Sequence, residues 1–189
     1  KAERDFIAWV AENRGEQAAK RAMKAEAVTK LMALWKLDGL AKVKATTEYV
    51  SELVEQGEQV VVMAWHTDVI VNLWQELTSA GYAVRTITGA SNATEKAWAV
   101  DQFQAGNFDV IIGQITAAGT GITLTAAAHI VFAQLPWAPG TYGQAQDRIY
   151  RIGQDKHVTT HVLNGLGMAS ENLWGVLADK AQVADAINT

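Results

Sequence analysis

Val60-Val61-Val62-Met63-Ala64-Trp65 is a continuous apolar run, the pattern of a strand that is buried on both faces of a parallel sheet. Outward from this run, segments with helical and strand periodicity alternate along the chain. Helices are predicted at 67–80, 92–104, 141–152 and 170–187, and further strands at 84–88, 110–112, 129–133 and 158–163. This alternation predicts an α/β fold, a parallel sheet flanked by helices on both faces, with ligands bound at the carboxyl ends of the strands.

The first 57 residues have a different pattern. They are rich in Ala, Glu, Lys and Leu, and their apolar residues recur at helical spacing. Gly15, Gly39 and Gly57 are predicted to break this region into two or three helices. We therefore divide the chain into an N-terminal helical extension or linker at 1–40 and a sheet domain at 41–189. For the extension, two interpretations remain open: a protrusion from the sheet domain, or a linker whose helix helps to cover a face of the sheet.

The composition restricts the class of protein. The chain has 189 residues, enough for one sizeable α/β domain with an appendage, and no cysteine, which excludes a disulfide framework and a thiolate metal site. Its formal net charge is −4, whereas proteins that bind nucleic acid mainly through Lys and Arg are usually basic. Any contact with nucleic acid should therefore be local and should rely on backbone N–H groups and a few cations.

The location of the protein is also constrained. No apolar run has the length of a membrane-spanning helix, so we expect no membrane partner. The chain begins with Lys-Ala-Glu-Arg-Asp, without an initiating Met or an apolar signal core. We expect a fragment of a longer intracellular protein, either cytoplasmic or associated with the nucleoid or nucleus.

The most specific motif is Gln144-Ala-Gln-Asp-Arg-Ile-Tyr-Arg-Ile-Gly-Gln154. Gln144, Arg148 and Arg151 are spaced i, i+4, i+7, so one helix face carries an amide and two guanidinium groups. Guanidinium groups match phosphate oxygens, and an arginine finger can accelerate phosphoryl transfer by about 10³ to 10⁵. The alternative is a solvated helix face on which Asp147 pairs with Arg151, but it does not explain the Gly-Gln ending.

Three consecutive stretches carry a resemblance to a known family. They are Ile115-Thr-Ala-Ala-Gly-Thr-Gly-Ile-Thr-Leu-Thr-Ala-Ala-Ala-His129, Ile130-Val-Phe-Ala-Gln-Leu-Pro-Trp-Ala-Pro139, and the motif that ends in Arg-Ile-Gly-Gln154. Together they resemble the second RecA-like lobe of superfamily 2 helicases, within it the Swi/Snf-type DNA translocases and, more narrowly, the HepA-related annealing-helicase branch. The resemblance implies a RecA-like sheet and a motor that uses ATP and Mg²⁺ to move on DNA.

The resemblance also implies roles for individual residues. Arg148 and Arg151 would be arginine fingers, and Gln144 would position the nucleotide. Gly119 and Gly121, assigned to nucleotide binding, would let the backbone approach nucleotide or DNA phosphates, because glycine has no Cβ. The residues implied in DNA binding are Trp65, His66, Thr88, Gly89, Ser91, Gln102, Thr116 and Trp137.

Some of these residues have simpler interpretations. Trp137 could be a packing residue that caps the sheet, and Ser91 could be an ordinary helix N-cap with Glu95 near capping-box distance. The sequence also departs from the family pattern at two positions. Gln134 stands where the family often has an acidic residue, which weakens a nucleotide-ribose contact there. Ala118 stands where the family has a second glycine, which implies a stiffer turn.

The chain lacks the parts that hold ATP. It has no Gly-x-x-x-x-Gly-Lys-Ser/Thr loop and no Asp-Glu pair at a strand end, and its four histidines have no metal-binding spacing. ATP and Mg²⁺ would therefore be held mainly by an N-terminal RecA-like lobe of the same protein, and the isolated chain would be inactive. The leading hypothesis is the second motor lobe of a DNA-dependent ATPase and translocase. The alternatives are a stand-alone, non-catalytic module that binds nucleic acid or protein and, more weakly supported, a dinucleotide-binding enzyme.

Overall fold

The computed structural model describes residues 16–118, 123–136, 139–147 and 157–168. The chain divides into two compact units, Lys1–Leu37 and Asp38–Thr189. Helix α2, Glu16–Ala41, belongs to both units, and the domain boundary expected at residue 40 stays a prediction. No helix in the described part of the chain is long and apolar enough to cross a membrane.

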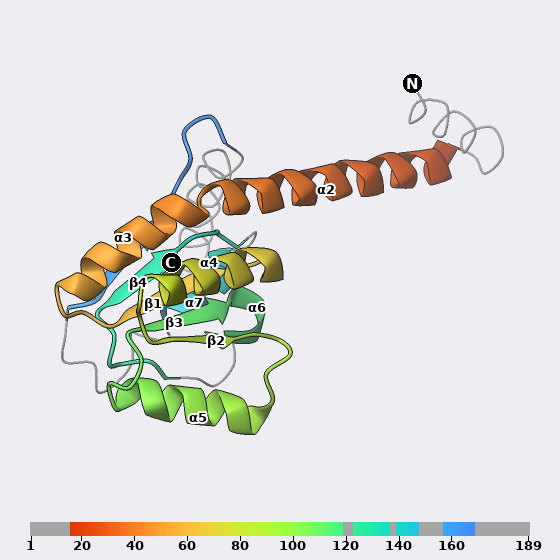
Figure 1. The fold of residues 1–189 in the computed structure, drawn as a ribbon. Helices are drawn as coiled ribbons and strands as arrows, with labels where there is room; N and C mark the ends of the chain where they lie inside the picture. The colour runs from red at the N-terminus through yellow and green to blue at the C-terminus, as the bar shows by residue number, and fades with distance from the viewer. Residues whose placement is uncertain (1–15, 119–122, 137–138, 148–156, 169–189) are drawn as a thin grey trace, which may run out of the picture. The chain divides into compact units, whose positions relative to one another are not determined.

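The second unit contains a five-stranded parallel sheet with the strand order β2-β3-β1-β4-β5 (Figure 1). Its strands are β1 Val60–Ala64, β2 Val84–Ile87, β3 Val110–Gln114, β4 His129–Phe132 and β5 Thr159–Val162. In the register, Val60 pairs with Val110 of β3 and with His129 of β4. The fold class predicted from the alternating pattern is confirmed, and the apolar run that begins at Val60 forms the central strand.

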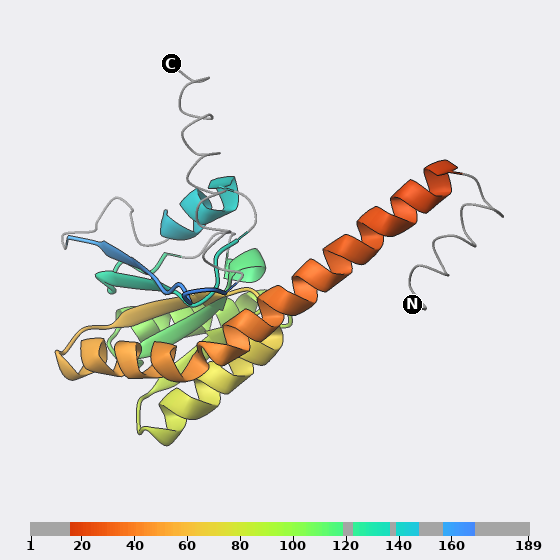
Figure 2. The same ribbon diagram turned by 90° about the horizontal axis from the view of Figure 1, so that it is seen from above.

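Helices cover both faces of the sheet, as predicted. Helices α3, Val43–Glu55, and α4, Thr67–Ser79, lie together on one face, where Val60 and Val62 join the core (Figure 2). Because side chains alternate along a strand, Val61 and Met63 point to the other face, and both are fully buried. That face carries helices α5, Ala93–Gln104, and α7, Pro139–Gln146. The Tyr142 ring of α7 lies 4.8 Å from that of Phe132, and the Arg85 guanidinium of β2 lies over the ring of Trp98 in α5.

A glycine follows the end of each of the helices α3, α4 and α5, whereas the glycine near the end of α2 lies inside that helix. Gly57, Gly81 and Gly106 follow α3, α4 and α5 with positive φ, the left-handed conformation that glycine adopts without strain. The break predicted at Gly39 is wrong, because α2 continues through it to Ala41. A Cβ at Gly39 would overlap the side-chain amide of Gln134, so this glycine permits close packing and does not end the helix.

Candidate functional site

The carboxyl ends of the five strands form one edge of the sheet, which we call the rim. Five segments make up its described part: Trp65–His66 after β1, Thr88–Ser91 after β2, Gln114–Thr116 at β3, Ala133–Gln134 after β4, and Leu163 after β5. Open parallel sheets bind ligands at this edge. Most of the described residues expected to bind DNA lie here.

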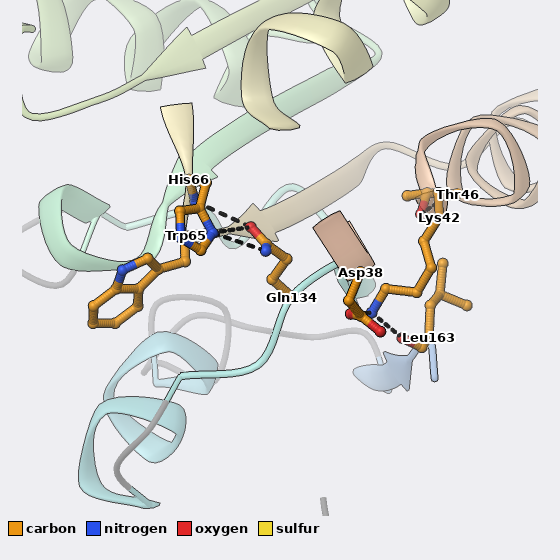
Figure 3. A network of polar contacts seen from close by, with 7 residues as sticks. All are labelled: Asp38, Lys42, Thr46, Trp65, His66, Gln134 and Leu163. Atoms are coloured by element: carbon orange, nitrogen blue, oxygen red, sulfur yellow. Dashed lines mark hydrogen bonds and ion pairs between the residues drawn. The ribbon is translucent and has the colours of Figure 1, made fainter. Parts of the chain in front are cut away.

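Gln134 joins the rim segment after β4 to the one after β1. Its side chain is only 1% exposed, and its Oε1 accepts hydrogen bonds from the backbone N–H groups of Trp65, at 3.1 Å, and His66, at 3.0 Å (Figure 3). Its Nε2 lies 3.0 Å from Nδ1 of His66. The amide therefore satisfies two backbone donors of the turn that leads into α4, and it faces the protein interior. Gln134, which stands where the family often has an acidic residue, therefore has a structural role in this chain.

Gln114 makes a similar link on the other side of β1. Its Oε1 accepts from the backbone N–H of Gly89 at 2.9 Å, and its Nε2 donates to the carbonyl oxygen of Trp65 at 3.2 Å. Sequence reasoning missed this residue because the predicted strand ended at residue 112, two residues before the end of β3. A polar residue directly after a buried apolar strand was the available signal. The side chain brings together two segments predicted to bind DNA, Trp65–His66 and Thr88–Ser91.

The turn at Thr88–Ser91 is closed by its own hydrogen bonds. The Thr88 N–H donates to Oγ of Ser91, the Ala90 N–H to Oγ1 of Thr88, and the Ser91 N–H to the carbonyl of Thr88. With Gly89 bonded to Gln114, all four backbone donors have partners within the chain. A phosphate bound here would therefore share or replace these bonds.

The assignment of Ser91 as an N-cap is wrong. Asn92 caps α5, with its side chain accepting from the backbone N–H of Glu95 at 2.9 Å. The Glu95 carboxylate in turn accepts from the Asn92 N–H at 3.0 Å and completes a capping box. The sequence signal was correct but displaced by one residue, so the Ser91 hydroxyl serves the turn and not the helix.

The remaining described candidates lie in two places. Thr116 is exposed in the short helix α6, Ile115–Ala118, which packs against α7, where Gln144 is also exposed. Gln102 lies at the far end of α5, where its Oε1 accepts from Nδ2 of Asn107 at 2.8 Å. This end of α5 leads into β3, so Gln102 is at the opposite edge of the sheet from the rim. Its predicted role in DNA binding is therefore not supported by proximity to the other candidates.

The residues with the most specific predicted roles lie outside the described part of the chain. They are Gly119, Gly121, Trp137, Arg148 and Arg151. The alternative pairing of Asp147 with Arg151 falls there too. The nucleotide contacts, the two arginine fingers and the coupling role of Trp137 all stay predictions.

A buried ion pair lies next to the rim segment that follows β5. Lys42, between α2 and α3, places its Nζ 2.9 Å from Oδ2 of Asp38 and donates to the carbonyl of Leu163 at 2.9 Å (Figure 3). Both charged side chains are almost fully buried. Burial lowers the pKa of Lys42, while its hydrogen bond and charge interaction with Asp38 act in the opposite direction. The contact attaches the start of α3 to the end of β5, and its two ends, Lys42 and Leu163, are 121 residues apart in the sequence.

Two of the four histidines meet in the sheet. His129 of β4 and His161 of β5 stack with their ring centroids 5.2 Å apart, and the Tyr49 hydroxyl lies 2.8 Å from Nδ1 of His161. Burial and the nearby His129 lower the pKa of His161. Among the described residues, no group of three or more His, Cys, Asp or Glu side chains could hold a metal ion.

Comparisons with known proteins agree with the fold and the motifs. A family model described as "Helicase conserved C-terminal domain" matches residues 41–153. A SWI/SNF-related, matrix-associated, actin-dependent regulator of chromatin, subfamily A-like protein 1, from Xenopus laevis is 36% identical over 145 residues, which cover 76% of this chain and 15% of that protein. The human DNA annealing helicase and endonuclease ZRANB3 is 36% identical over 156 residues, which cover 79% of this chain and 14% of that protein. The chain thus spans about 15% of the length of these relatives.

Solved structures show the same fold. The C-terminal part of the Fun30 ATPase domain superimposes with a TM-score of 0.67 at 23% identity, over 72% of this chain and 44% of that one. The C-terminal domain of the DEAD-box protein Dbp5 superimposes with a TM-score of 0.59 at 20% identity, over 74% of this chain and 77% of that one. At these identities the likeness concerns the fold alone.

Proposed function

Since the chain belongs to the helicase conserved C-terminal domain family and is related to SWI/SNF-type proteins and annealing helicases, we propose that it is the second motor lobe of a DNA-dependent ATPase that translocates on DNA. Its relatives include a DNA annealing helicase and a regulator of chromatin. We extend to this chain the DNA partner that these names imply, and with it a place of action in the nucleus or nucleoid. An N-terminal RecA-like lobe of the same protein completes the motor.

One observation carries the proposal. Two buried or half-buried glutamines hold three loops together at the rim, and these loops contain Trp65, His66 and Gly89, all expected to bind DNA. Short polar groups on these loops can contact phosphates without a large positive charge, and a backbone N–H that binds phosphate would share or exchange its present partner in the chain. This mode of binding suits a chain with a formal net charge of −4.

ATP is shared between the two lobes in this proposal. Bound Mg²⁺-ATP supplies the phosphoryl group whose transfer to water drives the motor. The second lobe contributes Arg148 and Arg151, which neutralise charge on the transferred phosphate, and Gln144, which positions the nucleotide. Gly119 and Gly121 let the backbone approach its phosphates. The exposed position of Gln144 on α7 supports a contact that reaches out of this lobe.

DNA movement follows from the closing of the two lobes around ATP. Thr116, in α6 next to α7, and Trp137 would transmit that closure to the DNA strand. The rim segments Trp65–His66 and Thr88–Ser91 would hold phosphates of the strand while the lobes step.

The test is a substitution in the protein that contains both lobes. Arg151→Ala should abolish DNA-stimulated ATP hydrolysis while ATP binding, measured with a fluorescent ATP analogue, changes little. Arg21→Ala removes an exposed arginine from α2 and should leave both unchanged. Hydrolysis that survives Arg151→Ala would overturn the arginine-finger role, and hydrolysis that never depends on DNA would overturn the translocase.

A further inference from the structure

The backbone N–H and carbonyl groups of Trp65 are bonded to side chains from the two strands that flank β1. Its carbonyl oxygen accepts from Nε2 of Gln114 at the end of β3, and its N–H donates to Oε1 of Gln134 just after β4. The strand order places β3 and β4 on opposite sides of β1. A continuous chain of hydrogen bonds therefore runs from Gly89 through Gln114 and Trp65 to Gln134.

The orientation of the Gln134 amide follows from its partners. A backbone N–H can only donate, and two of them, from Trp65 and His66, point at the same side-chain atom at 3.1 and 3.0 Å. That atom must be the amide oxygen, since an NH₂ group cannot accept. The NH₂ group of Gln134 therefore occupies the other position, 3.0 Å from Nδ1 of His66.

The same logic sets the proton on the His66 ring. An NH₂ group donates, so Nδ1 of His66 must accept and cannot carry a hydrogen. A neutral imidazole has one protonated nitrogen, which then has to be Nε2. The longer distance of 3.4 Å from Nδ1 to Oε1 of Gln134 is a weaker contact and does not compete with the one at 3.0 Å.

We infer that Gln134 is a positioning residue that fixes the Trp65–His66 turn and holds His66 as a neutral ring with its proton on Nε2. Gln114 fixes the same turn from the other side without touching the ring. The consequence for ligand binding rests on the proposed function: His66 acts at the rim on DNA phosphates as a neutral polar group and contributes no ionic attraction. Loss of the ring should then weaken DNA binding without changing its dependence on salt.

Ring ¹⁵N chemical shifts test the inference directly. The 189-residue chain, labelled with ¹⁵N-histidine, should show His66 at neutral pH with Nε2 protonated and Nδ1 bare, the His66 signals being identified by their absence in His66→Gln. A protonated Nδ1 in the unsubstituted protein would overturn the inference without any variant.

Gln134→Glu should change this state. The carboxylate still accepts from the Trp65 and His66 N–H groups, but it cannot donate, so Nδ1 should gain a proton. Gln114→Glu is the matched control, because it adds the same charge at the rim, retains the acceptor for Gly89 and removes only the donor to the Trp65 carbonyl, which does not touch the His66 ring. If Nδ1 of His66 stays unprotonated in Gln134→Glu, the assignment of Nδ1 as the acceptor of the Gln134 NH₂ group is contradicted.

Backbone hydrogen exchange tests the turn separately. Gln134→Leu removes the acceptor, so the Trp65 and His66 amides should exchange faster, whereas Gln134→Glu should leave them protected. Equal exchange in all three proteins would show that Gln134 does not hold the turn.

Binding of a short fluorescent duplex DNA separates this inference from the proposed function. If the ring state changes in Gln134→Glu and its DNA affinity differs from that of Gln114→Glu, the tautomer assignment and the DNA role of His66 both stand. If the ring state changes and the two affinities are equal, the tautomer assignment stands and the DNA role of His66 fails.

Discussion

His129 and His161 stack in adjacent strands, with Nδ1 of His129 only 2.9 Å from Nε2 of His161. Tyr49 of α3 closes the other side, with its hydroxyl 2.8 Å from Nδ1 of His161. Two rings this close cannot both carry a positive charge at low cost, because like charges repel in a partly buried site. The pair therefore makes the packing of α3 on the edge of the sheet sensitive to pH.

Acid should weaken the fold through this pair. Because the pKa of His161 is lowered in the folded protein, the unfolded chain binds more protons below the ordinary histidine value of about 6.5. The free energy of unfolding should therefore fall as the pH drops below about 6.5 and be unaffected by His161 above it. Urea unfolding of the wild type and His161→Gln at several pH values measures this, with the exposed His157→Gln as control. A pH dependence that is the same in all three proteins would contradict it.

Removing Lys42 should destabilise the sheet domain strongly. Lys42→Met leaves the Asp38 carboxylate buried without its cation and also removes the bond to Leu163, so we expect a loss of about 3 to 5 kcal/mol in urea unfolding. Lys44→Met is the matched control, since the Lys44–Glu48 pair is exposed and its N–O distance is 3.9 Å. We expect Lys44→Met to lower the free energy of unfolding by less than about 1 kcal/mol. If both variants lose a similar free energy of unfolding, the buried pair contributes no more to stability than the exposed one.

Gly39→Ala should destabilise the protein although alanine favours helices. The added Cβ would overlap the Gln134 amide, standing 2.6 Å from its Cδ, and lie 2.9 Å from Cγ2 of Val69. Overpacking of this kind costs about 1 to 3 kcal/mol. Gly143→Ala in α7 meets nothing within 4 Å and should be neutral or stabilise by up to about 1 kcal/mol. Thermal unfolding of both variants measures the two changes in stability. A stabilising Gly39→Ala would refute the packing role of this glycine.

The isolated chain should not hydrolyse ATP, with or without DNA. It has no phosphate-binding loop of the Gly-x-x-x-x-Gly-Lys-Ser/Thr type and no Asp-Glu pair at a strand end to hold Mg²⁺. A phosphate-release assay on the purified chain measures this, with Arg151→Ala prepared in parallel as the control for contaminating ATPases. Turnover present in the chain and absent from that variant would contradict the prediction.

Several details of the site could be anticipated and others could not. The alternation around Val60 predicted the sheet, and Asn92–Glu95 showed a capping box whose position was misjudged by one residue. The pattern predicts a helix break at Gly39, because nothing near it in the sequence indicates its packing partner, Gln134. Gln114 was missed because periodicity reports burial but does not identify a hydrogen-bond partner.

The sequence by itself determined the order of helices and strands, the parallel sheet and the family, because these depend on local periodicity and on short motifs. Only the tertiary structure decided which polar groups meet at the rim. Trp65 and Gln134 are 69 residues apart, and Lys42 and Leu163 are 121 apart. Such contacts depend on the order in which strands lie side by side, and no local pattern in the chain specifies that order.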